Sequence, residues 1–332
     1  MKYIGIDVSK AKLDLALLDG GGKALEQVVV KNTAKAITGK LHRWKHQHDL
    51  SITDCLVCFE PTGHYSNTVL RTLVGAEVPT WMAHPLEIKQ RMGMVRGKND
   101  KVDALRIADY AMRHQDKKRL AGPGTVAVLE LKQLLAFRMR LVVDSSRHKV
   151  FNTDLYPSMG EELREHFSAY SRRRIAQVKR MIAKVDALIN ALIMADPIMH
   201  RQYELLLTVE RVGPVLAAAL IAATERFSRM THARQLACHA GVAPHDHSSG
   251  SSIHGRARVS HHADKSLKSL LHISVLGTAS GKGELGAYYK RKVAEGKNAM
   301  SVLNAIRNKV IRRVCAVIQR GTPYELRQPA TA

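Results

Sequence analysis

The run YIGIDV at residues 3–8 decides how this chain begins to fold. It is almost wholly apolar and short, which is typical of a strand buried within a sheet. Asp7 interrupts it. A carboxylate inside a buried strand carries a large desolvation cost unless a cationic group meets it. The same run therefore predicts a central strand and makes Asp7 the first candidate functional residue.

Two further strands follow directly. The runs at residues 13–18 and 25–30 are apolar or alternating, and the turn sequence DGGG at 19–22 separates them. This pattern predicts three antiparallel strands with a tight hairpin between the second and the third. The glycine triplet lacks the Gly-Lys-Ser/Thr ending of a phosphate loop, so a turn is the better interpretation.

Helices and strands then alternate. We expect helices near 34–46 and 66–74, and strands at 55–59 and 78–82. Antiparallel strands followed by helix–strand alternation indicate a mixed sheet with helices packed on it. Another helix opens at Asn99-Asp100. Its expected apolar side consists of Val102, Ile107, Ala108 and Met112.

Three more acidic residues occupy notable positions. Glu60 ends the apolar run CLVCFE at 55–60, and Asp100 and Asp103 lie three apart in KNDKVDA at 98–104, on one helical face. Each has a simpler explanation: Asp100 as a helix cap, Asp103 as a partner of the helix dipole, Glu60 as the start of a loop. If the acids converge, each pair of charges about 4 Å apart repels by roughly 4 kcal/mol. A bound divalent ion resolves that repulsion, and oxygen ligands favour Mg²⁺ or Mn²⁺.

The overall charge indicates a polyanionic partner. The chain has 332 residues, a formal charge of +23 and 45% hydrophobic residues, which suggests two or three domains with ample core. No apolar run reaches about 18 residues and no signal peptide is evident, so nucleic acid is favoured over a membrane. A ribosomal or histone-like basic protein is the simpler alternative.

The four cysteines favour a reduced interior. Cys55 and Cys58 have the spacing of half a zinc site, but no second pair follows at a suitable distance, so core thiols are the preferred interpretation. A zinc site from Cys238, His239, His245 and His247 is conceivable and disfavoured. Reduced thiols fit a cytoplasmic protein.

The sequence AGPG at 121–124 marks a boundary, and the apolar residues beyond it have helical spacing. After Pro157, apolar residues alternate at spacings of three and four, which is typical of a coiled-coil seam. The seam consists of Ile175, Val178, Ile182, Val185, Ile189 and Leu192. It could pair within the chain or with another subunit. The flanking Arg172, Arg173 and Arg174 form either a solvated face or a nucleic-acid contact.

The segment VERVGP at 209–214 precedes a small apolar helix at 215–223. An apolar-x-Gly turn between two helices resembles a helix-hairpin-helix, whose backbone amides near Gly213 could hold a DNA phosphate. A plain helix junction would show the same pattern.

A polar stretch, SSGSS at 248–252, follows Pro244. On its own it indicates a flexible loop. A serine that attacks a phosphodiester needs its proton removed and the phosphate oxygens neutralised, and metal ions and arginines do both. Arg256 and Arg258 lie nearby in the sequence.

Four motifs together carry a family resemblance: YIGID, CFEPTG, KNDKVDA and SGSS. In this order and over nearly the whole chain, they resemble the DEDD transposases of bacterial insertion sequences, a family that includes a pilin-gene invertase and bridge-RNA-guided recombinases. The last two motifs are the specific ones. Ser248 directly precedes the matching serine, and Asn99 stands where threonine is frequent.

The resemblance implies a fold in three parts: an α/β RuvC-like (RNase H-like) metal-binding domain at 1–120, an α-helical coiled-coil region at 121–200 and a mostly α-helical transposase domain at 201–332. It implies metal-binding roles for Asp7, Glu60, Asp100 and Asp103, and a nucleophilic role for Ser249, with Ser248 as the alternative. Because these residues come from different domains, the site would be completed on assembly.

The resemblance also implies partners. We expect donor and target DNA, a structured non-coding guide RNA, and a homo-oligomer, dimer or tetramer, in the bacterial cytoplasm at the nucleoid. Two other hypotheses stay open at this stage. One is a metal-dependent junction nuclease that uses water, and the other is a non-catalytic factor that binds RNA.

Overall fold

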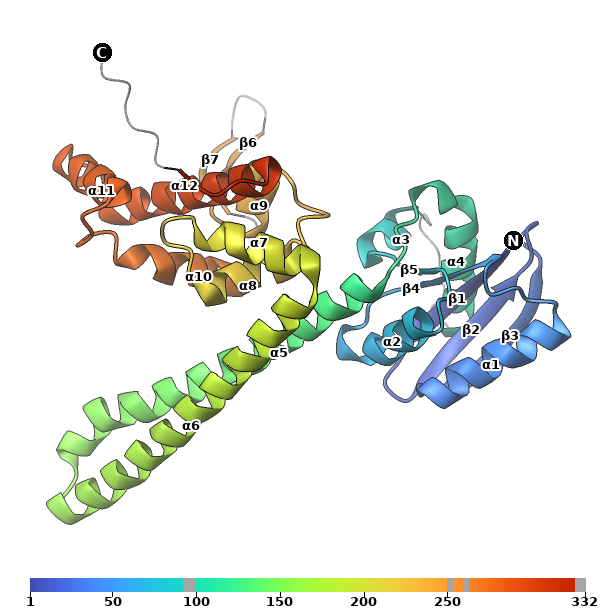
Figure 1. Cartoon of the computed structure of the whole chain (residues 1–332), viewed down its shortest axis with the longest axis horizontal. Helices are drawn as coiled ribbons and strands as arrows, with labels where there is room; N and C mark the ends of the chain where they lie inside the picture. Colours follow the sequence, from blue (N-terminus) through green and yellow to red (C-terminus); the bar gives the residue numbers. More distant parts are fainter. Residues whose placement is uncertain (92–99, 250–252, 260–262, 326–332) are drawn as a thin grey trace. The chain divides into compact units, whose positions relative to one another are not determined.

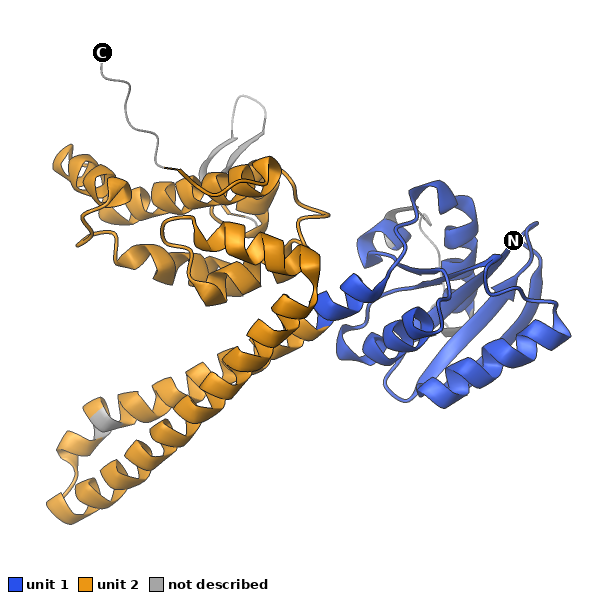
Figure 2. Ribbon diagram, in the orientation of Figure 1, with its two compact units in different colours: residues 1–129 blue, residues 130–332 orange. Residues whose placement is uncertain are grey.

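The computed structural model describes residues 1–91, 100–249, 253–259 and 263–325. The chain forms two compact units, residues 1–129 and residues 130–332, which are coloured separately in Figure 2. The boundary between them falls within one continuous helix, α5.

A five-stranded mixed sheet organises the first unit, with the spatial order β3-β2-β1-β4-β5. Strand β1 pairs antiparallel with β2 and parallel with β4, so it is central, as the sequence predicts. The strand bounds are β1 Lys2–Val8, β2 Lys12–Leu18, β3 Ala24–Lys31, β4 Cys55–Phe59 and β5 Thr80–Met82. This arrangement is compatible with the RNase H-like domain expected from the sequence.

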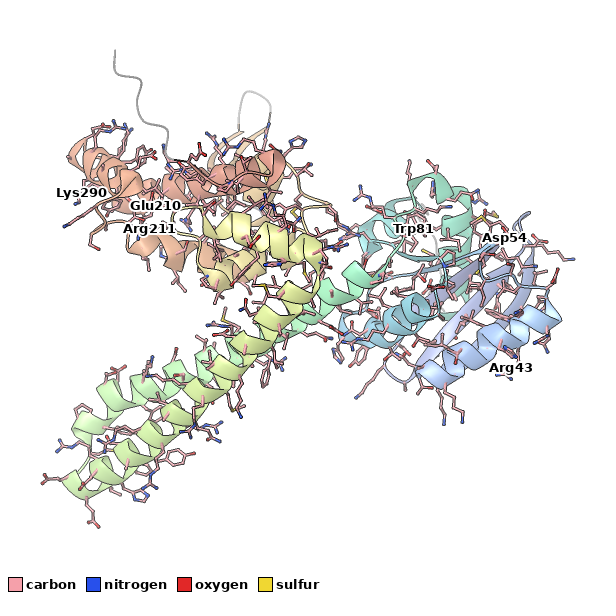
Figure 3. All side chains as sticks on the ribbon, in the orientation of Figure 1. Arg43, Asp54, Trp81, Glu210, Arg211 and Lys290 are labelled. Carbon is pink, nitrogen blue, oxygen red and sulfur yellow. The ribbon has the colours of Figure 1, made fainter. Side chains whose placement is uncertain are left out.

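Helices cover both faces of the sheet (Figure 1). On one face, α1 (Ala34–Gln47) and α2 (Asn67–Gly75) pack against a core that includes Ile4, Ile6 and Phe59. On the other, α3 (Pro85–Arg91) and α4 (Asp100–Arg113) pack against a second cluster, which contains Tyr3 and Trp81, the latter labelled in Figure 3. The alternation of side chains along β1 therefore sorts its residues between two cores.

Helix α4 lies directly against the backbone of β1. A Cβ added to Gly5 would stand 2.1 Å from the carbonyl oxygen of Ala104 and 2.4 Å from the amide nitrogen of Ala108. Only glycine allows this approach. Ile107 and Ala108 are buried there as expected, but Val102 is 38% exposed, so the prediction that it belongs to the apolar side was wrong. Val102 is in the first turn of α4, ahead of the contact with Gly5.

A polar contact ties α1 to the edge strand β3. Lys40, Trp44 and His48, spaced by four along the helix and its C-cap, all hydrogen-bond to the Glu26 carboxylate. Burial raises the pKa of Glu26, but these three hydrogen bonds, with the charge of Lys40, lower it to about 2. The carboxylate is therefore an ionised component of the fold.

Two long helices form a hairpin that begins the second unit. In Figure 1, α5 (Pro123–Val150) and α6 (Glu161–Ala195) run side by side, joined by a π-helical turn at Phe151–Leu155 and a 3-10 turn at Tyr156–Ser158. Arg138 pairs with Asp186 across the hairpin at 2.6 Å. Of the predicted seam, Val178, Val185 and Ile189 are buried and the other three positions are half-buried. The hairpin pairs its seam within the chain.

The remainder of the second unit is helical apart from one strand pair. Helix α12 contacts α7, α9, α10 and α11, so it is the central element. The bounds are α7 Pro197–Leu207, α8 Pro214–Ala223, α9 Ala233–His239, β6 His245–Ser249, β7 Ile253–Arg258, α10 Lys265–Leu276, α11 Glu284–Ala294 and α12 Ala299–Arg320.

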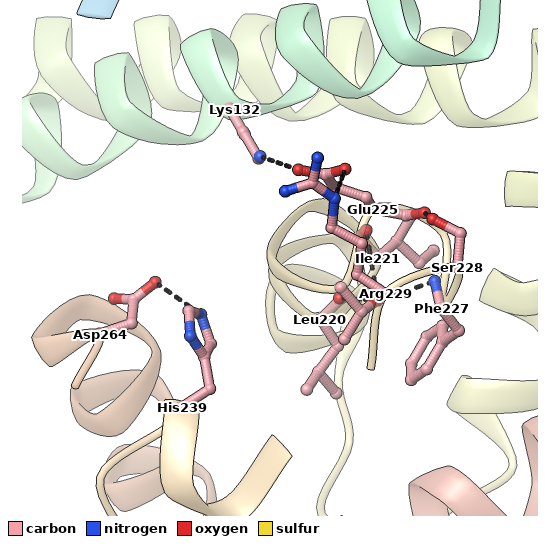
Figure 4. Close-up of polar contacts among 10 residues, drawn as sticks. Lys132, Leu220, Ile221, Glu225, Phe227, Ser228, Arg229, His239 and Asp264 are labelled. Atoms are coloured by element: carbon pink, nitrogen blue, oxygen red, sulfur yellow. Dashed lines mark hydrogen bonds and ion pairs between the residues drawn. The ribbon is translucent and has the colours of Figure 1, made fainter. Parts of the chain in front are cut away.

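The turn after α8 has an unusual backbone. Glu225, Arg226 and Phe227 all have positive φ angles, of 50°, 60° and 55°. The Thr224 hydroxyl accepts a hydrogen bond from the amide of Phe227, and Glu225 pairs with Lys132 at 3.6 Å and with Arg229 at 2.8 Å (Figure 4). These contacts offset a conformation that costs about 1–2 kcal/mol per residue.

Cys55, Cys58 and Cys315 are buried free thiols, as predicted for the first two, and burial raises the pKa of Cys55 and Cys315 to about 11. In the described part of the chain, none of the helices combines the length and the apolar character that crossing a membrane requires.

Candidate active site

Sheet register brings Asp7 and Glu60 to equivalent places. The parallel pairing of β1 with β4 matches Lys2 with Cys55 and continues to Ile6 with Phe59. Asp7 is the next residue of β1, and Glu60 is the first residue after β4. Residues opposite each other in neighbouring strands point to the same face. Because Ile6 and Phe59 enter the core beneath α1 and α2, the two acids face the α4 side.

Asp103 reaches the same region from α4. The helix passes over Gly5, two residues before Asp7, and its contact there begins at Ala104, the residue after Asp103. Burial raises the pKa of Glu60, and the negative charge of Asp103 raises it further. Electrostatic repulsion between Glu60 and Asp103 shows that the helix and the strand end bring their carboxylates together. Arg106 binds Asp103 Oδ1 at 2.8 Å.

A histidine that the sequence did not single out also borders this region. His84 follows β5 and opposes the effect of burial by lowering the pKa of Glu60. Its Nδ1 accepts a hydrogen bond from the amide of Leu86 at the start of α3. The carboxyl ends of β1, β4 and β5 therefore meet at one edge of the sheet, where ligands of α/β proteins commonly bind.

Asp100 is the first residue of α4, and its side chain lies outside the described residues. Three of the four predicted acids, Asp7, Glu60 and Asp103, are thus placed on adjacent elements. Within residues 1–91, 100–249, 253–259 and 263–325, no three histidine, cysteine or acidic side chains stand close enough to form a complete metal cage. The predicted acids would form a complete metal site only with the Asp100 carboxylate or after a movement of their side chains.

Sequence reasoning missed one acidic residue. Asp14 lies directly opposite Asp7 in the antiparallel pairing of β1 and β2, is 97% buried, and pairs with Lys12 at 3.2 Å. Its neighbours Leu13 and Leu15 belong to the α1–α2 core, so Asp14 faces α4, as Asp7 does. The sequence offered a partial signal, an acid between apolar neighbours in a predicted strand, but not the register between β1 and β2 that places it opposite Asp7.

The donor set fits a hard divalent cation. Carboxylate oxygens from β1, the end of β4 and α4 are the ligands that such ions prefer. The raised pKa of Glu60 means that the folded protein disfavours its negative charge when no cation is near. A bound cation would reverse that preference.

The predicted serine loop contains a strand pair. Residues of SSGSS were expected in a flexible loop, but β6 (His245–Ser249) and β7 (Ile253–Arg258) form an antiparallel hairpin. Ser249 is the last residue of β6 and pairs with Ile253, and Ser248 pairs with His254. Ser248 and Ser249 thus belong to a strand, which the sequence did not reveal because polar strands lack apolar alternation, and residues 250–252 lie outside the described residues.

The candidate basic contacts differ in their surroundings. Arg172 and Arg173 are exposed on α6, whereas Arg174 pairs with Asp144 of α5 at 3.1 Å. Arg256 and Arg258 lie on β7, beside the strand that ends at Ser249, and their side chains are outside the described residues. The Arg174 side chain is thus part of an ion pair within the helical hairpin.

The helix-hairpin-helix candidate joins α7 to α8. Gly213 caps α8 without a side-chain hydrogen bond, and a Cβ there would meet nothing within 4 Å, so its amides are approachable. Arg211 beside it has a φ of 71° and its guanidinium lies against Gly277 and Gly281, while Glu210 pairs with Arg313 at 3.4 Å. Figure 3 labels Glu210 and Arg211. Backbone amides, and not these side chains, are what the turn offers to a ligand.

Comparison with known proteins identifies the class. A model of transposases of the DEDD type matches residues 4–151, and a model of the IS116/IS110/IS902 transposase family matches residues 203–290. The pilin gene-inverting proteins of Moraxella bovis and Moraxella lacunata are 25% and 24% identical to this chain, over 98% of both chains in each case. A protein of insertion element IS110 from Streptomyces coelicolor is 32% identical over 44% of this chain and 35% of its own.

The matches define an enzyme that recombines DNA, of the transposase class. The chain belongs to the IS110 family of DEDD transposases. The first match contains Asp7, Glu60, Asp100 and Asp103, and the second contains Ser249. The chemistry of such a DEDD enzyme depends on a divalent metal.

Proposed function

We propose that this transposase joins DNA through a covalent serine intermediate, with Mg²⁺ or Mn²⁺ held by Asp7, Glu60, Asp100 and Asp103 in a RuvC-like domain. The observation that carries the metal half is that Asp7 and Glu60 directly follow the paired residues Ile6 and Phe59, while Asp103 on α4 repels Glu60. Bound metal would supply Lewis-acid stabilisation of the phosphate and of the leaving oxygen.

The serine half of the reaction balances without an added reactant. The Oγ atom of Ser249 attacks a DNA phosphorus, an Oγ–P bond forms, and the bond from phosphorus to the 3′ oxygen breaks. The proton of the serine hydroxyl passes to that leaving oxygen. In the second step a 3′ hydroxyl from the other DNA attacks the same phosphorus, the Oγ–P bond breaks, and the proton of that hydroxyl passes to the Oγ atom of Ser249. Arg256 and Arg258 are placed in sequence to neutralise the phosphate oxygens.

Ser249→Ala tests this mechanism, and Ser248→Ala is its matched control. With purified protein, Mn²⁺ and a radiolabelled donor duplex, the wild type and Ser248→Ala should form a covalent protein–DNA adduct that resists boiling in detergent. Mass spectrometry should locate the adduct on Ser249, and Ser249→Ala should form none. An adduct on Ser248 would move the nucleophile by one residue. Full cleavage by Ser249→Ala would replace this mechanism with hydrolysis by water.

The acids need their own test. Asp7→Asn combined with Asp103→Asn should abolish cleavage while leaving DNA binding intact, because basic residues outside the metal centre carry most of the affinity. Cleavage that survives the double change would come from a contaminant, and the protein would then be a binding factor without strand chemistry.

A structured guide RNA and self-association complete the proposal. The formal charge of +23 suits two polynucleotide partners. Phe137, Tyr170 and Leu188 are exposed on the α5–α6 hairpin, which suits contact with a second copy as a dimer or tetramer. Sequencing of RNA that co-purifies with the protein tests the first part. Light scattering of Leu188→Glu beside wild type tests the second, since a charge in the contact should lower the measured mass.

A further inference from the structure

Helix α12 carries an arginine at the centre of its buried face. Arg307 is only 7% exposed, and the helix buries Leu303, Val310, Ile311 and Val314 around the same side. Desolvation by burial lowers the pKa of Arg307. Guanidinium groups stay protonated at neutral pH even when buried. A positive charge is therefore held among apolar side chains.

This charge has no counterpart in the described part of the chain. Across residues 1–91, 100–249, 253–259 and 263–325, the Arg307 side chain makes no hydrogen bond or ion pair, and its buried Nε atom is without a partner. Other partly buried arginines of this unit are paired: Arg313 with Glu284 at 2.6 Å, and Arg226 with Asp196 at 3.0 Å. An uncompensated buried charge is costly, so an anion at this place would lower the free energy of the protein.

The position of Arg307 connects it with the serine hairpin. Asn304 and Asn308, one helical turn apart on α12, donate hydrogen bonds to the carbonyl oxygen of Val242 at 3.0 Å and 2.9 Å. Val242 is three residues before β6, the strand that ends at Ser249. Arg307 lies between these two asparagines in the sequence of the helix. The unpaired guanidinium thus belongs to the segment of α12 that fixes the base of the hairpin.

We propose that Arg307 binds a backbone phosphate of the DNA where it approaches the base of the serine hairpin. The planar fork of arginine matches two phosphate oxygens and takes part in short, charge-assisted hydrogen bonds. DNA is the occupant to which we commit, because the chain belongs to a family of DNA recombinases and the residue next to Arg307, Asn308, bonds to Val242, three residues before the strand that carries Ser249. The proposal rests on the proposed function for its substrate but does not require Ser249 to be the nucleophile.

Arg307→Met and Arg312→Met form a matched pair for the test. Both remove one positive charge from α12, but Arg312 is exposed, whereas methionine fills the buried space of Arg307. Binding of a fluorescent donor DNA duplex is measured over a range of salt concentrations, with the Ser249→Ala background used throughout so that no strand is cut. Melting temperatures are measured without DNA.

Arg307→Met should weaken DNA binding by roughly tenfold, as expected for hydrogen bonds to a charged group, and reduce the slope of log affinity against log salt by about 0.9, one phosphate contact. Its melting temperature should equal or exceed that of wild type, since a buried unpaired charge is gone. Arg312→Met should change affinity less than twofold. Arg307→Lys keeps the charge without the fork and should fall between wild type and Arg307→Met.

Three results would overturn the proposal: equal salt slopes for Arg307→Met and Arg312→Met, a clear fall in the melting temperature of Arg307→Met with DNA binding unchanged, or a loss confined to an RNA duplex of the same sequence. The first two would make Arg307 structural, and the third would assign it to RNA. If the covalent adduct fails to form in wild type while the DNA-binding difference remains, the serine mechanism fails and the phosphate contact stands.

Discussion

The acidic sheet edge of the first unit and helix α12 of the second unit carry charges of opposite sign. In both places the charge is unfavourable in the folded protein. At the sheet edge, Glu60 and Asp103 repel each other, so a cation bound there would be stabilising. In α12, Arg307 is buried with no partner among the described residues, so an anion bound there would be stabilising. Under the two proposals made above, a component of the reaction neutralises each of these charges: a metal ion in the first unit and a DNA phosphate in the second. Binding energy is thereby built in before substrate arrives.

The largest expected effect comes from Glu60→Gln. Strand joining should fall by about 10²–10³ or more, since a charged ligand of the metal centre is lost. The metal-free protein should nevertheless become more stable. Burial and Asp103 raise the pKa of Glu60 in the folded state, so its stabilising influence is present at low pH and is lost as the pH rises through that value. The variant should therefore have a higher melting temperature than wild type at pH 7.

Calorimetry in the presence of a chelator at pH 7 and pH 4 measures the gain, which should shrink at the lower pH. Glu87→Gln, an exposed carboxylate of α3, serves as the control and should change neither stability nor joining. A lower melting temperature for Glu60→Gln at pH 7 would break the comparison between the two units, because Glu60 would then be a stabilising residue.

Gly5→Ala should have the next largest effect. A methyl group would overlap the backbone of α4 at Ala104 and Ala108, which should destabilise the first unit by about 3 kcal/mol and displace Asp103. Gly39→Ala is a sharp control: Gly39 is an exposed helical residue of α1 with nothing within 4 Å of an added Cβ. It should gain about 0.5–1 kcal/mol. Chemical denaturation followed by tryptophan fluorescence distinguishes them, since both tryptophans, Trp44 and Trp81, lie in this unit.

Asp14→Asn should weaken Mn²⁺ binding by about tenfold, the range found for residues that support metal ligands. Asp14 lies opposite Asp7, and its charge adds to the field of the site. Lys12 pairs with Asp14, so Lys12→Met should strengthen Mn²⁺ binding a few-fold by removing a competing cation. Isothermal titration with Mn²⁺ measures both. Equal affinities in the two variants would limit the site to the four acids predicted from the sequence.

The smallest effect is expected at Glu26, on the edge strand β3. Glu26→Gln should cost about 1–2 kcal/mol, since the carboxylate accepts hydrogen bonds from Lys40, Trp44 and His48. Because the folded pKa is lowered from 4.5 to about 2, this stability is complete above about pH 4.5 and is lost as the pH falls toward 2. Acid titration of wild type and variant should converge near pH 2. A constant difference down to that pH would show that packing, and not ionisation, is responsible.

Much of the first unit could be predicted from the sequence because its strands are apolar and its turns have distinctive residues. The run at 55–60 has five strand residues and then Glu60, which places the acid at the strand end without any structure. Asp14 was not predicted, because its position opposite Asp7 depends on the register across a hairpin, and no periodic pattern reports register directly. Val102 was misplaced because a first helical turn can protrude beyond the sheet it covers.

The second unit was harder to predict for different reasons. The β6–β7 pair consists of polar residues, so it offered no alternation to detect. Arg307 sits in a helix rich in arginine and lysine, where a charged residue usually faces solvent. Only the packing of α12 against its neighbouring helices shows that Arg307 is buried. The seam of α6 was visible because helical periodicity survives without knowledge of the partner.

Copies of a mobile gene accumulate point mutations as they spread, and some of those copies lose activity through a mutation at Gly5. Every codon change away from glycine adds a Cβ, and the backbone of α4 already occupies that space. Such copies should produce protein that fails to accumulate, whereas a copy altered at Ser249 should still produce folded protein that occupies DNA. The first kind of decay is silent in the host, and the second leaves an inhibitor of its active siblings.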